Sequence, residues 1–153
     1  MKYAIISDVH ANDAALDAVL ADARTRGARR IICLGDVVGY GPEPAAVVAR
    51  VRRACAAVVA GNHDDAVSGR GSAEDFNDFA AEAVERHRTE LGADALEWLA
   101  SLPYVFSESG FACAHGEFSA PERFDYVFEA EDAVPSWRAR AEQLLFVGHI
   151  YVS

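Results

Sequence analysis

Residues 29–36, "RRIICLGD", form a short apolar run that stops abruptly at a glycine and an aspartate. A run of this length, bounded by turn residues, is typical of a buried strand. Two similar runs flank it, "KYAIIS" at residues 2–7 and "AAVVAGN" at residues 56–62, and the stretches between them, 12–27 and 43–55, have helical spacing. Strand, helix, strand, helix, strand with short links predicts a parallel sheet with right-handed crossovers, and therefore an α/β fold.

Residues at the ends of the two helical stretches support these boundaries. Asn12 or Asp13 can cap the first helix, and Gly27 can end it. Pro44 stands where the first turn of the second helix is expected, a position that tolerates proline.

The second half of the chain has a different order of elements. Residues 72–92 predict a helix that opens with Ser72 and Asp75 in a near capping box, and residues 93–102 predict another that stops before Pro103. Two apolar runs around Ser109 and Gly110 predict a hairpin. A short helix at residues 136–143 and a last strand, "LLFVGH", complete what we interpret as a single domain over residues 1–153.

Composition excludes several classes of protein. Of 153 residues, 52% are hydrophobic and 25% charged, and no apolar run reaches the ~18 residues of a membrane span, so no membrane partner is expected. The net charge of −10 argues against non-specific binding to nucleic acid. Since the N-terminus lacks the features of a signal peptide, a cytoplasmic location is expected. Cys33, Cys55 and Cys113 form no CxxC pair and are interpreted as reduced thiols.

Polar side chains follow nearly every predicted strand at the point where it ends. They are Asp8, His10, Asp36, Asn62, His63, His115 and His149. A lone aspartate or histidine in such a place is usually structural, but ligand sites gather at the carboxyl ends of parallel strands. Unpaired, such a set would be costly to bury, and divalent metals would satisfy it. Mixed oxygen and nitrogen ligands favour manganese, iron, zinc or nickel. The fifth histidine, His87, is expected in a solvated, charged helical face.

Five ordered motifs, "DVH", "GDVVGYG", "GNHD", "AHG" and "GH", resemble those of the calcineurin-like metallophosphoesterases. The stretch "GDVVGYGPEP" is most similar to the small bacterial phosphodiesterase branch, and the resemblance runs from residue 1 to about 148. It implies a four-layer α/β/β/α sandwich with a dinuclear metal site between the loop ends of two sheets. That family continues beyond the last motif, so the second sheet is expected to be incomplete, with an exposed edge through which the chain could form a homo-oligomer.

The same resemblance implies a role for each strand-end residue. Asp8 and His10 would bind the first metal, Asp36 would bridge both, and Asn62, His115 and His149 would bind the second. The spacing within Asp8-x-His10 puts both side chains on one side of an extended segment. His63 would lie over the substrate and, with an ordinary pKa of about 6.5, would protonate the leaving alcohol.

Two neighbouring residues have two interpretations each. Asp64 either orients His63 or is a loop carboxylate, and the second is favoured. Asn12 either faces the site or caps a helix, which explains it well enough.

These roles predict a metal-dependent phosphoesterase with two divalent ions, manganese being favoured. It would hydrolyse phosphodiesters, either small-molecule phosphoesters or nucleotides, by attack of a metal-bridging hydroxide. A nucleotide-binding α/β domain is disfavoured because the chain has no G-x-G-x-x-G or P-loop lysine motif.

The end of the chain departs from the family pattern. It reads "GHIYVS" where "GHTHVP" would be typical, so Tyr151 stands in place of a ligand histidine. A neutral phenol is a poor ligand for divalent ions, so the first metal is expected to be under-occupied. The alternative function is therefore a weakly active or inactive metal-binding or regulatory remnant of the family.

Overall fold

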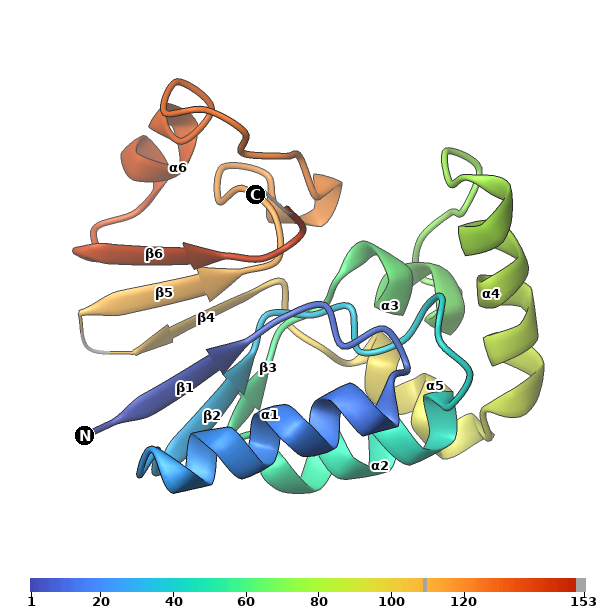
Figure 1. Ribbon diagram of the computed structural model, residues 1–153. Coiled ribbons are helices and arrows are strands. Elements are labelled where there is room, and N and C mark those ends of the chain that lie inside the picture. The colour runs from blue at the N-terminus through green and yellow to red at the C-terminus, as the bar shows by residue number, and fades with distance from the viewer. Residues whose placement is uncertain (109, 151–153) are drawn as a thin grey trace.

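A computed structural model describes residues 1–108 and 110–150 and contains two three-stranded sheets packed face to face (Figure 1). The first sheet has the order β1 (Tyr3–Ile6), β2 (Arg30–Cys33), β3 (Ala57–Val58), and all its pairs are parallel. Helices α1 (Asp13–Thr25) and α2 (Pro44–Ala54) make the two crossovers. The predicted parallel β-α-β-α-β unit is therefore confirmed.

Local chemistry sets the ends of these helices. The Asn12 side chain caps α1 by accepting a hydrogen bond from the Ala15 N–H at 2.9 Å. Gly27 follows α1 with φ +77°, a left-handed conformation that suits glycine. Pro44 occupies the first turn of α2, as expected.

The second sheet has the order β4 (Val105–Glu108), β5 (Phe111–Ala114), β6 (Leu144–Val147). The first pair is the predicted antiparallel hairpin, whereas β5 and β6 run parallel. One apolar cluster joins the facing sides of both sheets; its members include Tyr3, Ile32, Val59, Phe106, Cys113 and Phe146.

Helices cover the outer faces of both sheets. Helices α1 and α2 pack on the first sheet, and α6 (Val134–Ala139) lies over the second (Figure 1). A short turn, η1 (Pro121–Arg123), is the element that precedes α6 in the chain. The remaining helices, α3 (Asn62–Ser68), α4 (Asp78–Glu90) and α5 (Ala93–Ala100), close one end of the molecule. These layers are those of the expected α/β/β/α sandwich.

Three local predictions need correction. Helix α4 begins at Asp78 rather than in the 72–75 region, because Asn77 is its cap and accepts from the Ala80 N–H. The third strand is only Ala57–Val58, since Asn62 already opens α3. The last helix is α6, displaced by two residues toward the N-terminus and shorter than expected.

The three cysteines are free thiols; Cys33 and Cys113 are buried and Cys55 is partly exposed. In the part of the chain that the structure describes, no helix is long and apolar enough to cross a membrane.

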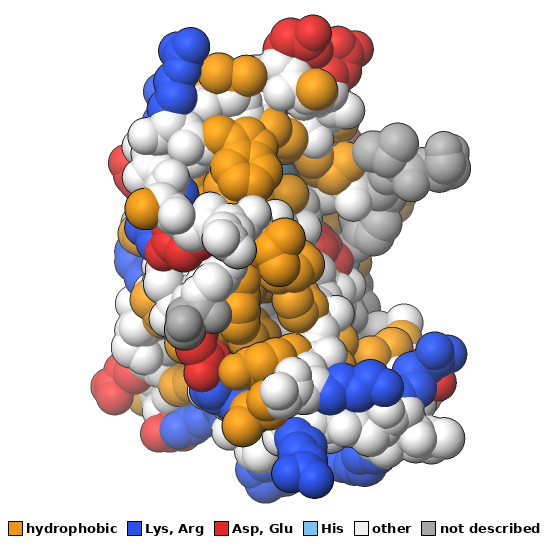
Figure 2. Space-filling view, turned by 90° about the vertical axis from the view of Figure 1, so that its left-hand side faces the viewer, with side chains coloured by type: hydrophobic (Ala, Val, Ile, Leu, Met, Phe, Trp, Pro, Cys, Tyr) orange, Lys and Arg blue, Asp and Glu red, His pale blue; other side chains and the backbone are white. Residues whose placement is uncertain are grey.

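The outer strands are β1 and β3 in the first sheet and β4 and β6 in the second, and each has a single neighbour among the described strands. Two side chains of β6, Leu144 and Val147, are 57% and 36% exposed. Seen from the left-hand side of Figure 1, hydrophobic side chains gather in the middle of the face, between charged side chains at top and bottom (Figure 2).

Candidate metal centre

The strand-end residues sit on loops whose backbone has an unusual conformation. Asp8, His10, Asp36 and His149 have φ values of +57°, +49°, +52° and +68°. Non-glycine residues rarely adopt this left-handed region, and such strain tends to cluster at functional sites. Backbone hydrogen bonds from the Asp8 N–H to the Gly35 carbonyl and from the His10 N–H to the Asp36 carbonyl hold the two loops together.

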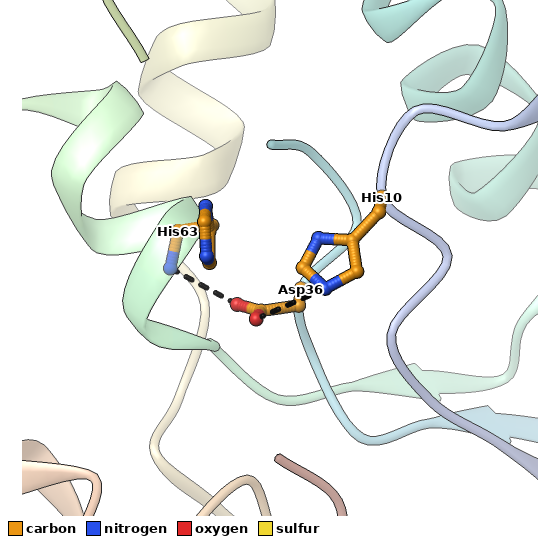
Figure 3. A group of neighbouring side chains, drawn as sticks. All are labelled: His10, Asp36 and His63. Atoms are coloured by element: carbon orange, nitrogen blue, oxygen red, sulfur yellow. Dashed lines mark hydrogen bonds and ion pairs between the residues drawn. The ribbon is translucent and has the colours of Figure 1, made fainter. Parts of the chain in front are cut away.

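Asp36 lies at the middle of this cluster and is 1% exposed. Its Oδ2 is 3.7 Å from His10 Nε2 and 3.3 Å from His115 Nε2, while its Oδ1 accepts the His63 backbone N–H at 3.0 Å. Figure 3 shows the His10 and His63 rings on either side of this carboxylate.

Two groups of potential metal-ligating atoms share Asp36. One consists of His10, Asp36 and His63, and the other of Asp36, His115 and His149; within each, the ligand atoms lie within 4.8 Å of one another. Asp8 adjoins both groups, because its Oδ1 is 3.9 Å from His10 Nε2 and its Oδ2 accepts the His149 N–H at 3.2 Å.

Two histidines are oriented by backbone carbonyls. His10 Nδ1 lies 3.1 Å from the Val38 oxygen, and His115 Nδ1 lies 2.7 Å from the Leu34 oxygen. A carbonyl oxygen can only accept, so each Nδ1 carries a proton and each Nε2 faces Asp36. Metal-binding histidines in proteins are commonly held in this way.

Electrostatics at the centre favours positive charge. Burial opposes protonation of His115, but the Asp36 carboxylate outweighs it and raises the pKa of His115 to about 9. Burial likewise opposes ionisation of Asp36, yet His115 and the other imidazoles hold the pKa of Asp36 well below its usual range. A buried carboxylate that stabilises a proton on a neighbouring imidazole provides the same field for a cation.

The donor set fits divalent metal ions. Asn62 Oδ1 and His63 Nδ1 are buried and have no hydrogen-bond partner in the described structure. An unpaired buried polar atom is costly, and a cation within reach would satisfy it. Carboxylate, amide and imidazole donors together suit manganese, iron, zinc or nickel.

The environment of His63 differs from the expected one. Burial lowers the pKa of His63 to about 4, although the nearby Asp36 carboxylate acts to raise it. The ordinary value assumed from the sequence is therefore wrong for this site. At neutral pH His63 is a neutral imidazole, which can still donate or accept a hydrogen bond.

Asp64 neither orients His63 nor lies in a loop, so both interpretations of it are wrong. It belongs to α3, is fully buried, and accepts the backbone N–H groups of Val38 and Gly61 at 3.2 and 3.0 Å. Burial, with the nearby Asp36 charge, raises the pKa of Asp64 to about 7. Asp64 therefore fastens the loop after β2 to the start of α3, and the described hydrogen bonds do not join it to His63.

A family model described as calcineurin-like phosphoesterase matches residues 1–153. This chain belongs to the calcineurin-like phosphoesterase family. Membership implies divalent metal ions, and the groups that share Asp36 are the candidates to hold them.

The crystal structure of a metallophosphoesterase from Sphaerobacter thermophilus is 40% identical, covers 97% of this chain and 60% of that one, and has a TM-score of 0.82. The uncharacterized protein MJ0912 of Methanocaldococcus jannaschii is 36% identical over 97% of this chain and 62% of its own length. The chain thus spans about three fifths of these two relatives. The hypothetical protein PH1004 of Pyrococcus horikoshii, 17% identical with a TM-score of 0.75 over 95% of this chain and 68% of that one, shares the fold.

In this calcineurin-like phosphoesterase, sequence reasoning missed His87. It was expected on a solvated face but is fully buried. Its Nδ1 accepts the Gly39 N–H at 3.1 Å, and its Nε2 lies 2.9 Å from the Gly41 oxygen. Burial is the main cause that lowers the pKa of His87. Its spacing from the buried Ala80, Ala83 and Val84 was the signal that could have revealed it.

The loop that His87 holds carries a second missed residue, Tyr40. The Tyr40 ring lies 4.9 Å from both the His10 and His63 ring centroids and lines the cavity over the centre. Tyr151, expected to replace a ligand histidine, lies outside the described residues.

Proposed function

We propose that this chain is a phosphodiesterase that uses two divalent metal ions. The observation that carries the proposal is the position of Asp36, whose carboxylate belongs to both groups of ligand atoms. A carboxylate shared by two groups of ligand atoms is the feature that would let one residue hold both ions of a two-ion centre.

In this proposal Asp8, His10 and Asp36 hold the first ion. Asp36 also contributes to the second, together with Asn62, His115 and His149. When bound, the ions supply positive charge for the phosphoryl oxygens and lower the pKa of water. The nitrogen and oxygen donors favour manganese, with iron, zinc and nickel as alternatives.

The chain's own residues supply orientation. The Val38 and Leu34 carbonyls fix the rings of His10 and His115, so little side-chain freedom is lost when a ligand binds. His63 lines the cavity in which a substrate oxygen would lie, while its Nδ1, unpaired among the described residues, is buried beside Gly39. As a neutral imidazole it would donate a hydrogen bond to that oxygen or accept one from it.

The test uses manganese-loaded protein and bis-(p-nitrophenyl) phosphate. Asp36→Asn keeps the size of the side chain and an oxygen that can accept the His63 N–H, but it removes the shared charge. Both bound manganese, measured by plasma mass spectrometry, and kcat/KM should fall, the metal affinity by roughly 10- to 100-fold or more.

A matched control is Asp22→Asn, which changes an exposed carboxylate paired with Arg26 and should alter neither readout. An Asp36→Asn variant with unchanged metal content and rate would refute the assignment. A parent protein that binds less than two manganese per chain and turns over slowly would support the alternative of a weakly active family member.

A further inference from the structure

The cavity over the metal centre has a volume of about 350 Å³, and aromatic side chains line it on two sides. On one side the His63 ring lies between Tyr40 and Phe76, with centroid distances of 4.9 and 4.5 Å. Tyr40 comes from the loop after β2 and Phe76 from the segment before α4.

On the other side three rings stack in a column. Tyr126 lies 4.0 Å from His149 with the planes 13° apart, and Phe128 lies 5.1 Å from Tyr126 at 14°. The column begins at a predicted metal ligand and ends in solvent, where Tyr126 is 51% and Phe128 64% exposed. Near-parallel rings with one open face form a platform on which another flat ring can stack.

The charges around the cavity limit what else could bind. Its lining includes the carboxylates of Asp8, Asp36 and Asp75, and among the described residues it includes no lysine or arginine. In an adjoining hollow, Arg123 pairs with Asp125 at 3.2 Å. A chain of further phosphates would therefore meet the Asp75 carboxylate, and like charges repel.

We propose that the substrate is an ester of a single phosphate group with a flat aromatic substituent, such as a nucleobase, that stacks on the open face of Phe128, the outermost ring of this column. This inference rests on the proposed function, because the phosphate would lie at the Asp36 centre. It narrows that function: esters with only aliphatic substituents and polyphosphate-linked compounds are poorer ligands.

The direct test compares AMP with ribose 5-phosphate, which share phosphate and sugar and differ by the base. Calorimetric titration of the manganese-loaded protein should show AMP binding roughly 5- to 100-fold more tightly, the range expected for one stacked base. ADP, titrated at the same free manganese concentration, should bind no more tightly than AMP.

Phe128→Ala should remove most of the AMP preference and leave ribose 5-phosphate binding unchanged, whereas Phe128→Trp should preserve it. Trp137→Ala is the matched control, because Trp137 is a similarly exposed aromatic residue, 52%, that lies on α6 and does not line the cavity.

The outcomes separate this inference from the proposed function. Hydrolysis of bis-(p-nitrophenyl) phosphate together with equal affinities for AMP and ribose 5-phosphate overturns the aromatic subsite and leaves the function standing. ADP binding tenfold tighter than AMP overturns the single-phosphate specificity. Loss of the AMP preference in Trp137→Ala but not in Phe128→Ala overturns the position of the subsite. A base preference without hydrolysis supports the subsite and contradicts the activity.

Discussion

Replacing His87 should destabilise the loop that carries Tyr40, although the described hydrogen bonds of His87 involve no predicted metal ligand. The change that tests this is His87→Ala on the buried face of α4. It removes the acceptor of the Gly39 N–H and the partner of the Gly41 oxygen. The Gly41 oxygen keeps a second donor, Arg86, at 2.6 Å, so the Gly39 N–H is the group left without a partner.

The magnitude follows from two contributions. An unsatisfied buried N–H costs about 1–3 kcal/mol. The space vacated by a fully buried ring adds roughly 2 kcal/mol or more, as other large-to-small core substitutions do. Together they predict a loss of roughly 3–5 kcal/mol in the free energy of unfolding, which for a chain of this size lowers Tm by about 6–20 °C.

The assay is urea unfolding followed by circular dichroism, with kcat/KM and bound manganese measured on the same samples. His87→Asn retains an acceptor oxygen where Nδ1 stood, so it should recover about 1–2 kcal/mol of the loss. Glu82→Ala, on the exposed face of the same helix, should change stability by less than about 0.5 kcal/mol. The rate should fall in His87→Ala while manganese content stays constant, because Tyr40 moves and the ligands do not. If His87→Asn is as unstable as His87→Ala, the hydrogen bond to Gly39 is not what His87 contributes.

Three further predictions concern the same loop, pH and assembly. Gly39→Ala should be more destabilising in thermal unfolding than Gly110→Ala, since both glycines have φ +93° but only at Gly39 would a Cβ collide with the His63 ring; equal losses would contradict this. Because the pKa of His87 is lower in the folded protein, His87 of the unfolded chain takes up its proton at a higher pH than His87 of the folded protein. The stability that comes from neutral His87 is therefore fully present above pH 6.5 and is lost as the pH falls below that value. Urea unfolding at pH 7.5 and 5.0 should therefore show a smaller acid-induced loss in His87→Asn than in the parent. Finally, the open edges of β1 and β6 should promote self-association, and a compact monomer at high concentration in sedimentation would refute this.

The positions of the strand-end residues could be predicted in part from local sequence signals. Asp8 and Asp36 follow neighbouring parallel strands, whose carboxyl ends lie at the same edge of the sheet, so strand order alone predicts that they are close. The hydrogen bond from the Asp8 N–H to the Gly35 carbonyl shows that the two loops do meet there. His115 and His149 follow β5 and β6 in the same way, within the second sheet. The resemblance to the family was needed to place the two sheet ends against each other.

Asp64 shows where these signals stop. Its position in "GNHDD" permits a loop or a catalytic role, and only the fold decides that it bonds to Val38, 26 residues away. Helix α3 begins at Asn62 and turns the Asp64 side chain away from the cavity into the interior.

The sequence by itself determined the order of the elements and the residues at their carboxyl ends, because hydrophobic spacing and turn residues act over a few positions. Only the tertiary structure decided that His87 is buried, since its partners in the Gly39–Gly41 loop are 46 to 48 residues distant and its neighbours in the chain are charged. The aromatic column of His149, Tyr126 and Phe128 likewise exists only because the loop before α6 folds over the end of β6. Contacts of this kind depend on how whole elements pack, and no short-range pattern encodes them.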